Sequence, residues 1–261
     1  MKVLLLGNSQ DLGSWFEGGK KRHEIVQEQL AAEFGEDVEV TVRNFWPNER
    51  MPALIDRWLA ESRPDMVYMN VTAFPFAYES LPLRFKRVLG RMGPAVGDAG
   101  LRFAGSKRWA HNAVFRTVRR YGQAVFGGDT HFTCDEVIER VSEAVRVAVR
   151  HEDTCVVVEG PLGRGEPELT RRQRRRKEAR RLAVHRALQD LCTGLHVQYF
   201  GRDEPLPPER RHARGETVGD GTHFNPAGHA RVAADLFENM CDAWQAHQSG
   251  ASVPGRQGST A

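Results

Sequence analysis

The stretch Val3-Leu4-Leu5-Leu6-Gly7-Asn8-Ser9-Gln10 contains four apolar residues in a row, then a glycine and three polar residues. A short, wholly apolar run is typical of a strand that is buried on both faces of a parallel sheet. The polar residues follow where that strand ends, and parallel sheets bind their ligands at the carboxyl ends of strands. The stretch therefore predicts an α/β fold with Ser9 at the edge where a site would lie.

Helix and strand patterns alternate downstream of this stretch. The predicted elements are a helix over 20–34, an edge strand over 38–42, a helix between Pro52 and Pro64, and a strand over 65–71. The first helix carries Val26, Leu30 and Phe34 at four-residue spacing, which gives it one apolar side. This β-α-β-α-β order is that of a right-handed, doubly wound parallel sheet.

The alternation stops at about residue 75 and resumes at about 132. Glycine and proline interrupt two basic, aromatic-rich stretches in this segment, which we interpret as an insertion and a candidate lid. The later predicted elements are a helix over 134–150, a strand over 153–159, a helix over 171–191, a strand over 195–200 and a helix from Asn225-Pro226. We expect one domain over 1–247 and a disordered tail over 248–261.

Composition excludes several classes of protein. The 261 residues are 40% hydrophobic, with a net charge of +3, which suits a globular chain and excludes one that is disordered throughout. No apolar run approaches the roughly 20 residues of a membrane-spanning helix. Four scattered cysteines argue against a zinc site or a disulfide framework, and the first apolar stretch is too short for a signal peptide. We therefore expect a cytoplasmic protein.

A second polar stretch, Asp220-Gly221-Thr222-His223-Phe224-Asn225-Pro226-Ala227-Gly228-His229, lies just before the last predicted helix. Aspartate and histidine three residues apart on a tight turn can lie side by side. The carboxylate can then fix the imidazole tautomer, and the ring can take a proton from a serine. In the alternative interpretation Asp220 makes only a turn hydrogen bond, and Ser9 only caps its own turn.

The early serine and the late Asp-x-x-His together resemble the SGNH (GDSL-type) hydrolase family, from Met1 to about Trp244. The resemblance implies a three-layer α/β/α sandwich around a five-stranded parallel sheet of flavodoxin-like order, with a helical insertion after strand three. It implies hydrolysis of an ester or acyl bond in a small-molecule substrate, with Ser9 as nucleophile, His223 as base and Asp220 orienting His223. No metal or organic cofactor is implied.

The sequence departs from the family pattern in its first three motifs. Asn8 stands where the family usually has aspartate, and residues 42–48 lack the glycine of the second motif. Residues 68–74 hold a single asparagine, Asn70, where the family has Gly-x-Asn-Asp. The candidate oxyanion donors are the Ser9 N–H, Asn70, Asn44 and Asn48. Alternatively, Asn70 is a buried strand residue whose polar atoms are satisfied by backbone.

Residues Arg171-Arg172-Gln173-Arg174-Arg175-Arg176-Lys177, followed by Arg180 and Arg181, form a basic run at the start of a predicted helix. The helix macrodipole disfavours positive charge there. The run is either a solvated helix face or an anion site, and we predict that an acidic substrate or carrier docks on it; there is no strong nucleic-acid signal.

Two further groups of residues bear on the candidate site. If the insertion is a lid, we expect Phe74, Phe76, Trp109 or Phe115 to line an acyl pocket. His229 could join His223 at a metal, but no third ligand follows at suitable spacing. Two other functions stay open: an acyltransferase on the same scaffold, and a non-catalytic polyanion-binding module that has lost the oxyanion hole.

Overall fold

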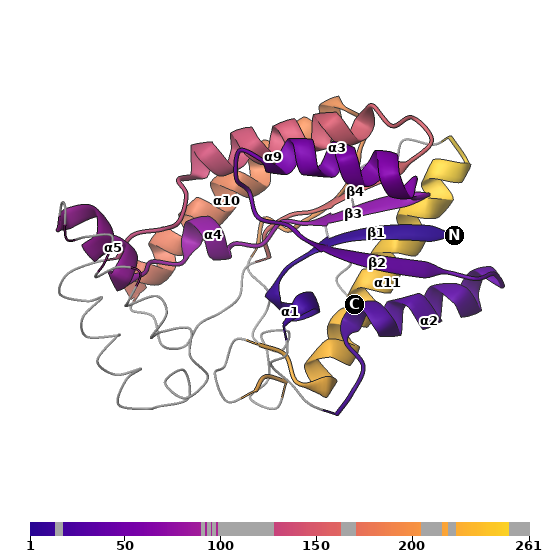
Figure 1. The fold of residues 1–261 in the computed structure, drawn as a ribbon, viewed down its shortest axis with the longest axis horizontal. Coiled ribbons are helices and arrows are strands. Elements are labelled where there is room, and N and C mark those ends of the chain that lie inside the picture. The colour runs from indigo at the N-terminus through magenta and orange to yellow at the C-terminus, as the bar shows by residue number, and fades with distance from the viewer. Residues whose placement is uncertain are drawn as a thin grey trace.

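The computed structural model describes residues 1–13, 18–89, 128–162, 171–204, 216–218 and 223–250, with Met92, Ala95 and Asp98. Five parallel strands form one sheet in the order β2-β1-β3-β4-β5 (Figure 1). The strands are β1 (Lys2–Gly7), β2 (Glu39–Asn44), β3 (Met66–Asn70), β4 (Cys155–Glu159) and β5 (Gln198–Phe200). The predicted five-stranded parallel sheet of flavodoxin-like order is confirmed.

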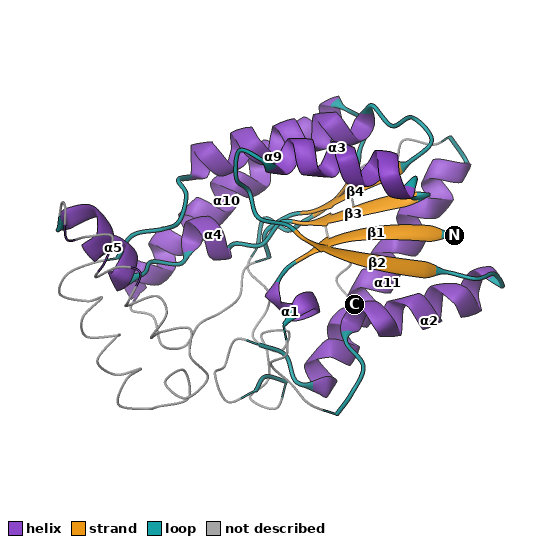
Figure 2. Ribbon diagram, in the orientation of Figure 1, coloured by secondary structure: helices purple, strands orange, loops and turns teal. Residues whose placement is uncertain are grey.

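Helices cover both faces of the sheet and complete the three layers (Figure 2). One face is covered by α3 (Met51–Ser62), α9 (Cys134–Val149) and α10 (Arg171–Gly194), and the other by α2 (Arg22–Phe34) and α11 (Pro226–Gln248). Leu4 and Leu6 of β1 join the core under α3 and α9, whereas Val3 and Leu5 join the core under α2 and α11. Strand β1 is wholly apolar because both of its faces are buried.

Four strands end level with one another. Gly7 of β1 pairs with Asn44 of β2, and Asn70 of β3 pairs with Glu159 of β4. We call this side of the sheet the carboxyl edge and the opposite side the amino edge. Three polar side chains, from Asn44, Asn70 and Glu159, therefore stand at the carboxyl edge, where β1 gives way to Asn8 and Ser9.

Capping residues set where the long helices begin. Thr133 accepts a hydrogen bond from Glu136 N–H at 3.2 Å, and the Glu136 carboxylate accepts one from Thr133 N–H at 2.7 Å, so a capping box starts α9. Asn225 accepts from Gly228 N–H at 3.0 Å and Pro226 is the first residue of α11, as predicted from the sequence.

The structure differs from the predicted elements in two places. The sequence predicts a loop after β1, but Ser9–Leu12 form a one-turn helix, α1, because Asn8 and Asp11 make a capping box around it. The last strand begins at Gln198 rather than at residue 195. Helix α10 continues to Gly194, and His196 then takes a left-handed φ of 56° that turns the chain before the strand.

The segment after β3 begins with two short helices, α4 (Phe74–Ala77) and α5 (Leu81–Val88). Each has a proline in its first turn. The backbones of Ser80 and Asp129 form a single antiparallel β-bridge, which brings the beginning and the end of this segment together. None of the helices in the described ranges is long and apolar enough to cross a membrane.

Candidate active site at the carboxyl edge of the sheet

Ser9 lies at the carboxyl end of β1 as the first residue of α1, and its side chain is exposed. Asn8 precedes it in an extended conformation and accepts a hydrogen bond from Gln10 N–H at 2.9 Å. The cap holds the first turn of the helix in place. A strand end followed at once by a capped helix start therefore presents the Ser9 hydroxyl outward from the edge.

A buried ion pair between Asp11 and Arg22 stabilises α1. Asp11 accepts hydrogen bonds from Asn8 N–H at 3.0 Å and from the Arg22 guanidinium at 2.7 and 2.6 Å. Burial alone would raise the pKa of Asp11, but the charge and hydrogen bonds of Arg22 outweigh it and lower that pKa. A Cβ at Gly7 would lie 2.2 Å from Asp11 Oδ2, so only glycine fits at this strand end.

A second contact joins α1 to the segment that carries His223. The Phe224 N–H donates to Gln10 Oε1 at 2.9 Å, and Gln10 is buried. The carbonyl of His223 accepts from Val218 N–H at 2.8 Å, and this pairing anchors the half-buried histidine to the preceding loop. The residue after Ser9 thus contacts the residue after His223. Asp220, the third predicted member of the triad, lies outside the described residues.

Asn70 is linked by hydrogen bonds to the elements on either side of it. Asn8 Nδ2 donates to Asn70 Oδ1 at 2.9 Å, and Asn70 Nδ2 donates to Glu159 Oε2. Asn8 Oδ1 accepts the hydrogen bond from Gln10 N–H, so the amide nitrogen of Asn8 faces Asn70. Asn70 must therefore turn its oxygen toward Asn8, and its nitrogen faces Glu159. The predicted alternative for Asn70, satisfaction by backbone, is wrong, because side chains satisfy it.

The other two asparagines differ in their surroundings. Asn48 Oδ1 accepts from Arg50 N–H at 2.9 Å, so its side chain serves its own loop. Asn44 is exposed at the end of β2, with its Cα paired to that of Gly7. Of the three, only Asn70 is bonded to the residue before Ser9.

Sequence reasoning missed Glu159, which is buried at the end of β4. The signal was available. The rule that drew attention to Ser9, a polar residue at the end of a buried apolar strand, applies equally to Cys155-Val156-Val157-Val158-Glu159. Gln10 and Asp11 were missed for another reason: their roles depend on partners more than ten residues away, Phe224 and Arg22.

No family model matches the chain, and no curated protein sequence matches it. Solved structures do. The psychrotrophic esterase EstA from Pseudoalteromonas sp., in a structure inhibited by monoethylphosphonate, is 9% identical, with 92% of this chain and 97% of that chain covered and a TM-score of 0.55. A catalytic mutant of the acetylxylan esterase Axe2 from Geobacillus stearothermophilus is 13% identical, with 93% and 95% covered and a TM-score of 0.53. The lipase/acylhydrolase from Enterococcus faecalis is 13% identical, with 92% and 94% covered and a TM-score of 0.50. This chain shares the fold of these three proteins.

His229, six residues after His223, lies inside the fold. It is buried, and its Nδ1 accepts from Arg22 N–H at 3.1 Å. Burial, followed by the nearby Arg22 charge, lowers the pKa of His229 to about 4. Within the described ranges, no group of three or more histidine, cysteine, aspartate or glutamate side chains could hold a metal ion.

The aromatic residues predicted to line an acyl pocket divide into three cases. Phe74 is 46% exposed at the carboxyl edge. Phe76 is 1% exposed and packs in the core under α9, so its predicted place in a pocket is wrong: the one-turn helix α4 directs it inward. Trp109 and Phe115 lie outside the described residues.

The basic run is not one uniform face of α10. Arg181 is buried and donates to the carbonyl of Arg202 at 2.6 Å, to that of Asp203 at 2.6 Å and to that of Pro161 at 3.2 Å. Its guanidinium therefore ties the chain after β4 to the chain after β5, with Glu178 as its ionic partner at 2.6 Å. The prediction that places Arg181 in a solvated or anion-binding run is wrong. The exposed arginines lie nearer the start of the helix, at 171, 172 and 174–176.

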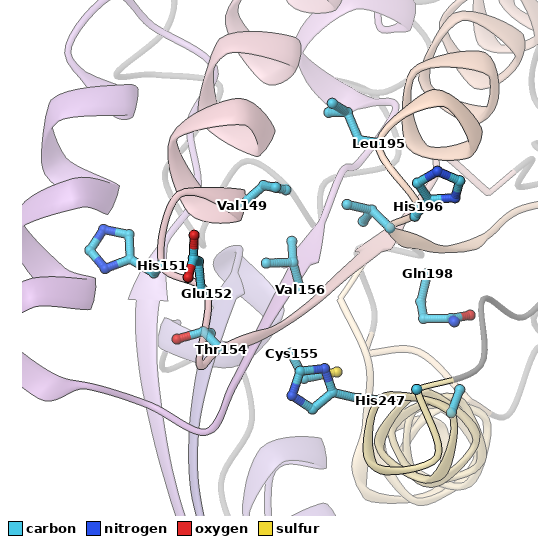
Figure 3. A pocket seen from close by; sticks show the side chains of 13 residues that line it. Val149, His151, Glu152, Thr154, Cys155, Val156, Leu195, His196, Gln198 and His247 are labelled. Atoms are coloured by element: carbon cyan, nitrogen blue, oxygen red, sulfur yellow. The ribbon is translucent and has the colours of Figure 1, made fainter.

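A cavity of about 440 Å³ lies at the amino edge, between the starts of β4 and β5 and the end of α11 (Figure 3). Its polar lining includes His151, Glu152, His196, Gln198 and His247. His151 Nε2 lies 3.0 Å from Asp56 Oδ1, and the His247 ring stacks on Trp244 with centroids 5.7 Å apart. The cavity is on the far side of the sheet from Ser9.

Proposed function

We propose that the chain is a serine hydrolase that cleaves ester bonds at the carboxyl edge, with Ser9, His223 and Asp220 as its triad. The observation that carries the proposal is the 2.9 Å hydrogen bond from Phe224 N–H to Gln10 Oε1. It joins the residue after the candidate nucleophile to the residue after the candidate base. The fold shared with esterases and a lipase/acylhydrolase supports the same reaction class.

In this mechanism Ser9 Oγ attacks the ester carbonyl while His223 takes the hydroxyl proton. The tetrahedral intermediate collapses as His223 gives that proton to the departing alcohol, which leaves an acyl group on Ser9. Water then attacks the acyl carbonyl, His223 takes one of its protons, and the acid is released with Ser9 restored. Asp220 keeps the ring in the tautomer whose free nitrogen faces the serine.

The developing oxyanion needs hydrogen-bond donors about 3 Å away. The Ser9 N–H is one proposed donor, because it belongs to the same residue as the Oγ that bonds to the attacked carbon. Asn70 is the second, since Glu159 takes one hydrogen of its amide nitrogen and leaves the other for a ligand. Asn8 and Glu159 hold that amide from both ends, so it would not have to reorient during the reaction.

The substrate class proposed here is a small acyl ester. The neighbours with this fold are named as esterases, an acetylxylan esterase and a lipase/acylhydrolase, so the ester bond is what their names have in common. Neither the acyl group nor the alcohol follows from the fold. If a bound alcohol replaced water in the second half of the reaction, the same residues would catalyse acyl transfer.

A fluorophosphonate probe tests the proposal directly, because such probes bond covalently only to an activated serine. We expect the intact protein to gain the mass of one phosphonyl group, located by peptide mapping on the peptide that contains Ser9. Ser9→Ala and His223→Ala should each abolish labelling while keeping the same circular dichroism spectrum. A wild-type chain that stays unlabelled, or a label elsewhere, would overturn the proposal in favour of a non-catalytic binding module.

A further inference from the structure

A row of aromatic rings stands at the carboxyl edge on the side of α3 and α9. The Trp46 ring lies 5.2 Å from that of His131 and 6.3 Å from that of Phe74, and Phe74 lies 5.3 Å from Tyr78. Phe74 is 46% exposed, which is unusual for a large apolar ring that already has three aromatic neighbours. Burial lowers the pKa of His131, so its ring is neutral at pH 7 and adds to the apolar row.

The row flanks the strand end that carries Ser9. Trp46 follows Phe45, whose N–H donates to the carbonyl of Gly7 at 2.8 Å. Phe74 is four residues beyond Asn70, which is bonded to Asn8. Trp46 packs against the core under α3 and α9, whereas His223 precedes α11 on the opposite face. An ester at Ser9 would therefore have the proposed base on one side and the rings on the other.

At its outer end the row runs into the first turns of α10, which packs beside α4 (Figure 1). The Lys177 ammonium lies 4.0 Å above the centre of the Tyr78 ring. Glu79 pairs with Arg180 at 3.2 Å and with Arg176 at 3.9 Å. These contacts fix the beginning of α10 against the aromatic row.

The same turns of α10 concentrate positive charge. Residues 171–177 hold five arginines and one lysine and no acidic residue, although the net charge of the whole chain is only +3. Neighbouring like charges three and four residues apart repel, and the macrodipole disfavours cations at a helix start. Glu79 offsets part of this charge through Arg176, and an anion from outside would relieve the repulsion further. Arg174 is exposed and lies one helical turn before Lys177, so it is on the side of α10 that faces Tyr78, and its guanidinium can present a planar, bidentate donor pair.

We propose that the enzyme prefers esters whose acyl chain ends in an anionic group. The apolar part of the chain lies along Trp46, Phe74 and Tyr78, and a carboxylate or phosphate at its far end meets Lys177 and Arg174. This inference rests on the proposed function, because it places the ester carbonyl at Ser9. It goes further by naming the substrate class and the residues that select it.

Two series of 4-nitrophenyl esters test the inference, with acyl chains of increasing length that end either in a carboxylate or in a methyl group. We expect the carboxylate series to be preferred only beyond a threshold length, by about tenfold in kcat/KM and mainly through KM. The preference should shrink as salt rises from about 0.05 to 0.5 M, because Arg174 is exposed and Lys177 is only partly buried. A phosphate-ended ester of the threshold length shows which anion binds better.

Paired variants separate recognition from catalysis. Replacing Arg174 and Lys177 together by glutamine should bring the two series to within about twofold and leave hydrolysis of 4-nitrophenyl acetate unchanged. Replacing Arg146 and Arg150, both exposed at the end of α9, removes the same charge and should keep the preference. Phe74→Ala should weaken binding of both long-chain series equally.

The possible failures can be told apart. A wild-type enzyme that hydrolyses the acetate but shows no preference at any length overturns the inference and leaves the proposed function intact. The inference also fails if the Arg146/Arg150 variant loses the preference as fully as the Arg174/Lys177 variant. Absence of Ser9-dependent acetate hydrolysis overturns the proposed function, and this inference with it.

Discussion

The two edges of the sheet differ in how their polar side chains are arranged. The amino edge has the cavity of about 440 Å³, with three histidines in its lining. At the carboxyl edge, side chains at the ends of β1, β3 and β4 form one hydrogen-bonded series, from Asn8 through Asn70 to Glu159. The carboxyl edge is thus the side on which polar side chains from neighbouring strands are bonded to one another.

Helix direction explains why the edges suit different chemistry. Helices α10 and α11 begin on the carboxyl side and end on the amino side, at Gly194 and Gln248. Helix starts offer unpaired N–H groups and helix ends offer unpaired carbonyl oxygens. Negative charge that develops on a reacting carbonyl is stabilised by the first kind of surface and opposed by the second. A histidine-lined cavity at the amino edge lacks that support.

The largest expected effect separates the edges directly. Ser9→Ala and His223→Ala should each lower kcat/KM for 4-nitrophenyl acetate by about 10³-fold or more, because triad members act as one unit. His196→Ala and His247→Ala, at the amino edge, should change it by less than about twofold. Steady-state kinetics on all four variants measures the contrast. A large loss from the amino-edge variants, with Ser9→Ala near wild type, would reverse the assignment of the edges.

The second expected effect distinguishes positions within the carboxyl edge. Asn70→Ala should lower kcat by about 10²-fold, the usual cost of losing one oxyanion donor. Asn44→Ala is the matched control, since it removes the same side chain from the end of β2, on the other side of β1. We expect it to retain most of the activity, because Asn44 has no bond to the residue before Ser9 within the described structure. Equal losses from the two variants would remove Asn70 from the oxyanion site.

Much of the fold could be predicted because it depends on local patterns. The apolar run of β1 and the Asn225-Pro226 start of α11 are each encoded in a few adjacent residues. The place of Ser9 at the carboxyl edge followed from β1 alone, since a parallel strand ends where its apolar run ends.

The rest of the site depends on partners far apart in the sequence. Gln10 contacts Phe224 across 214 residues, and Asn70 contacts Glu159 across 89. Arg181 belongs to a run of nearly identical residues, and only the loops that close over it make it a buried structural group. No periodicity in the sequence distinguishes it from Arg180, which is partly exposed and paired with Glu79.

The third expected effect tests whether the hydrogen-bonded series acts as a unit. Glu159→Leu should lower kcat by about tenfold with little change in KM, because Asn70 loses the acceptor that orients it. Glu159→Gln keeps an acceptor oxygen and should restore most of that loss. In an Asn70→Ala background both substitutions should have no further effect on kcat, as a double-mutant cycle would show. Additive losses would mean that Glu159 acts independently of Asn70.

The smallest expected effect concerns stability at the carboxyl edge rather than rate. The folded protein keeps His229 neutral down to about pH 4, while the unfolded chain binds a proton near its ordinary pKa of 6.5. Between these values the unfolded state holds more protons, so the free energy of unfolding falls as pH falls, by at most about 1.4 kcal/mol per pH unit. This contribution is fully present above about pH 6.5 and is lost as pH falls toward 4.

His229→Asn isolates that contribution, because an amide oxygen can accept the Arg22 N–H bond in place of Nδ1 and does not titrate. Urea unfolding at several pH values from 4 to 7 should show a shallower decline for the variant, by on the order of 1 kcal/mol between pH 6.5 and 5.5. Asp11 does not confuse the measurement, since it is present in both proteins and its contribution, which sets in as pH falls toward its ordinary pKa of 3.8, cancels from the comparison. A variant whose stability declines as steeply as that of the wild type would show that His229 is not the group that the folded protein keeps neutral.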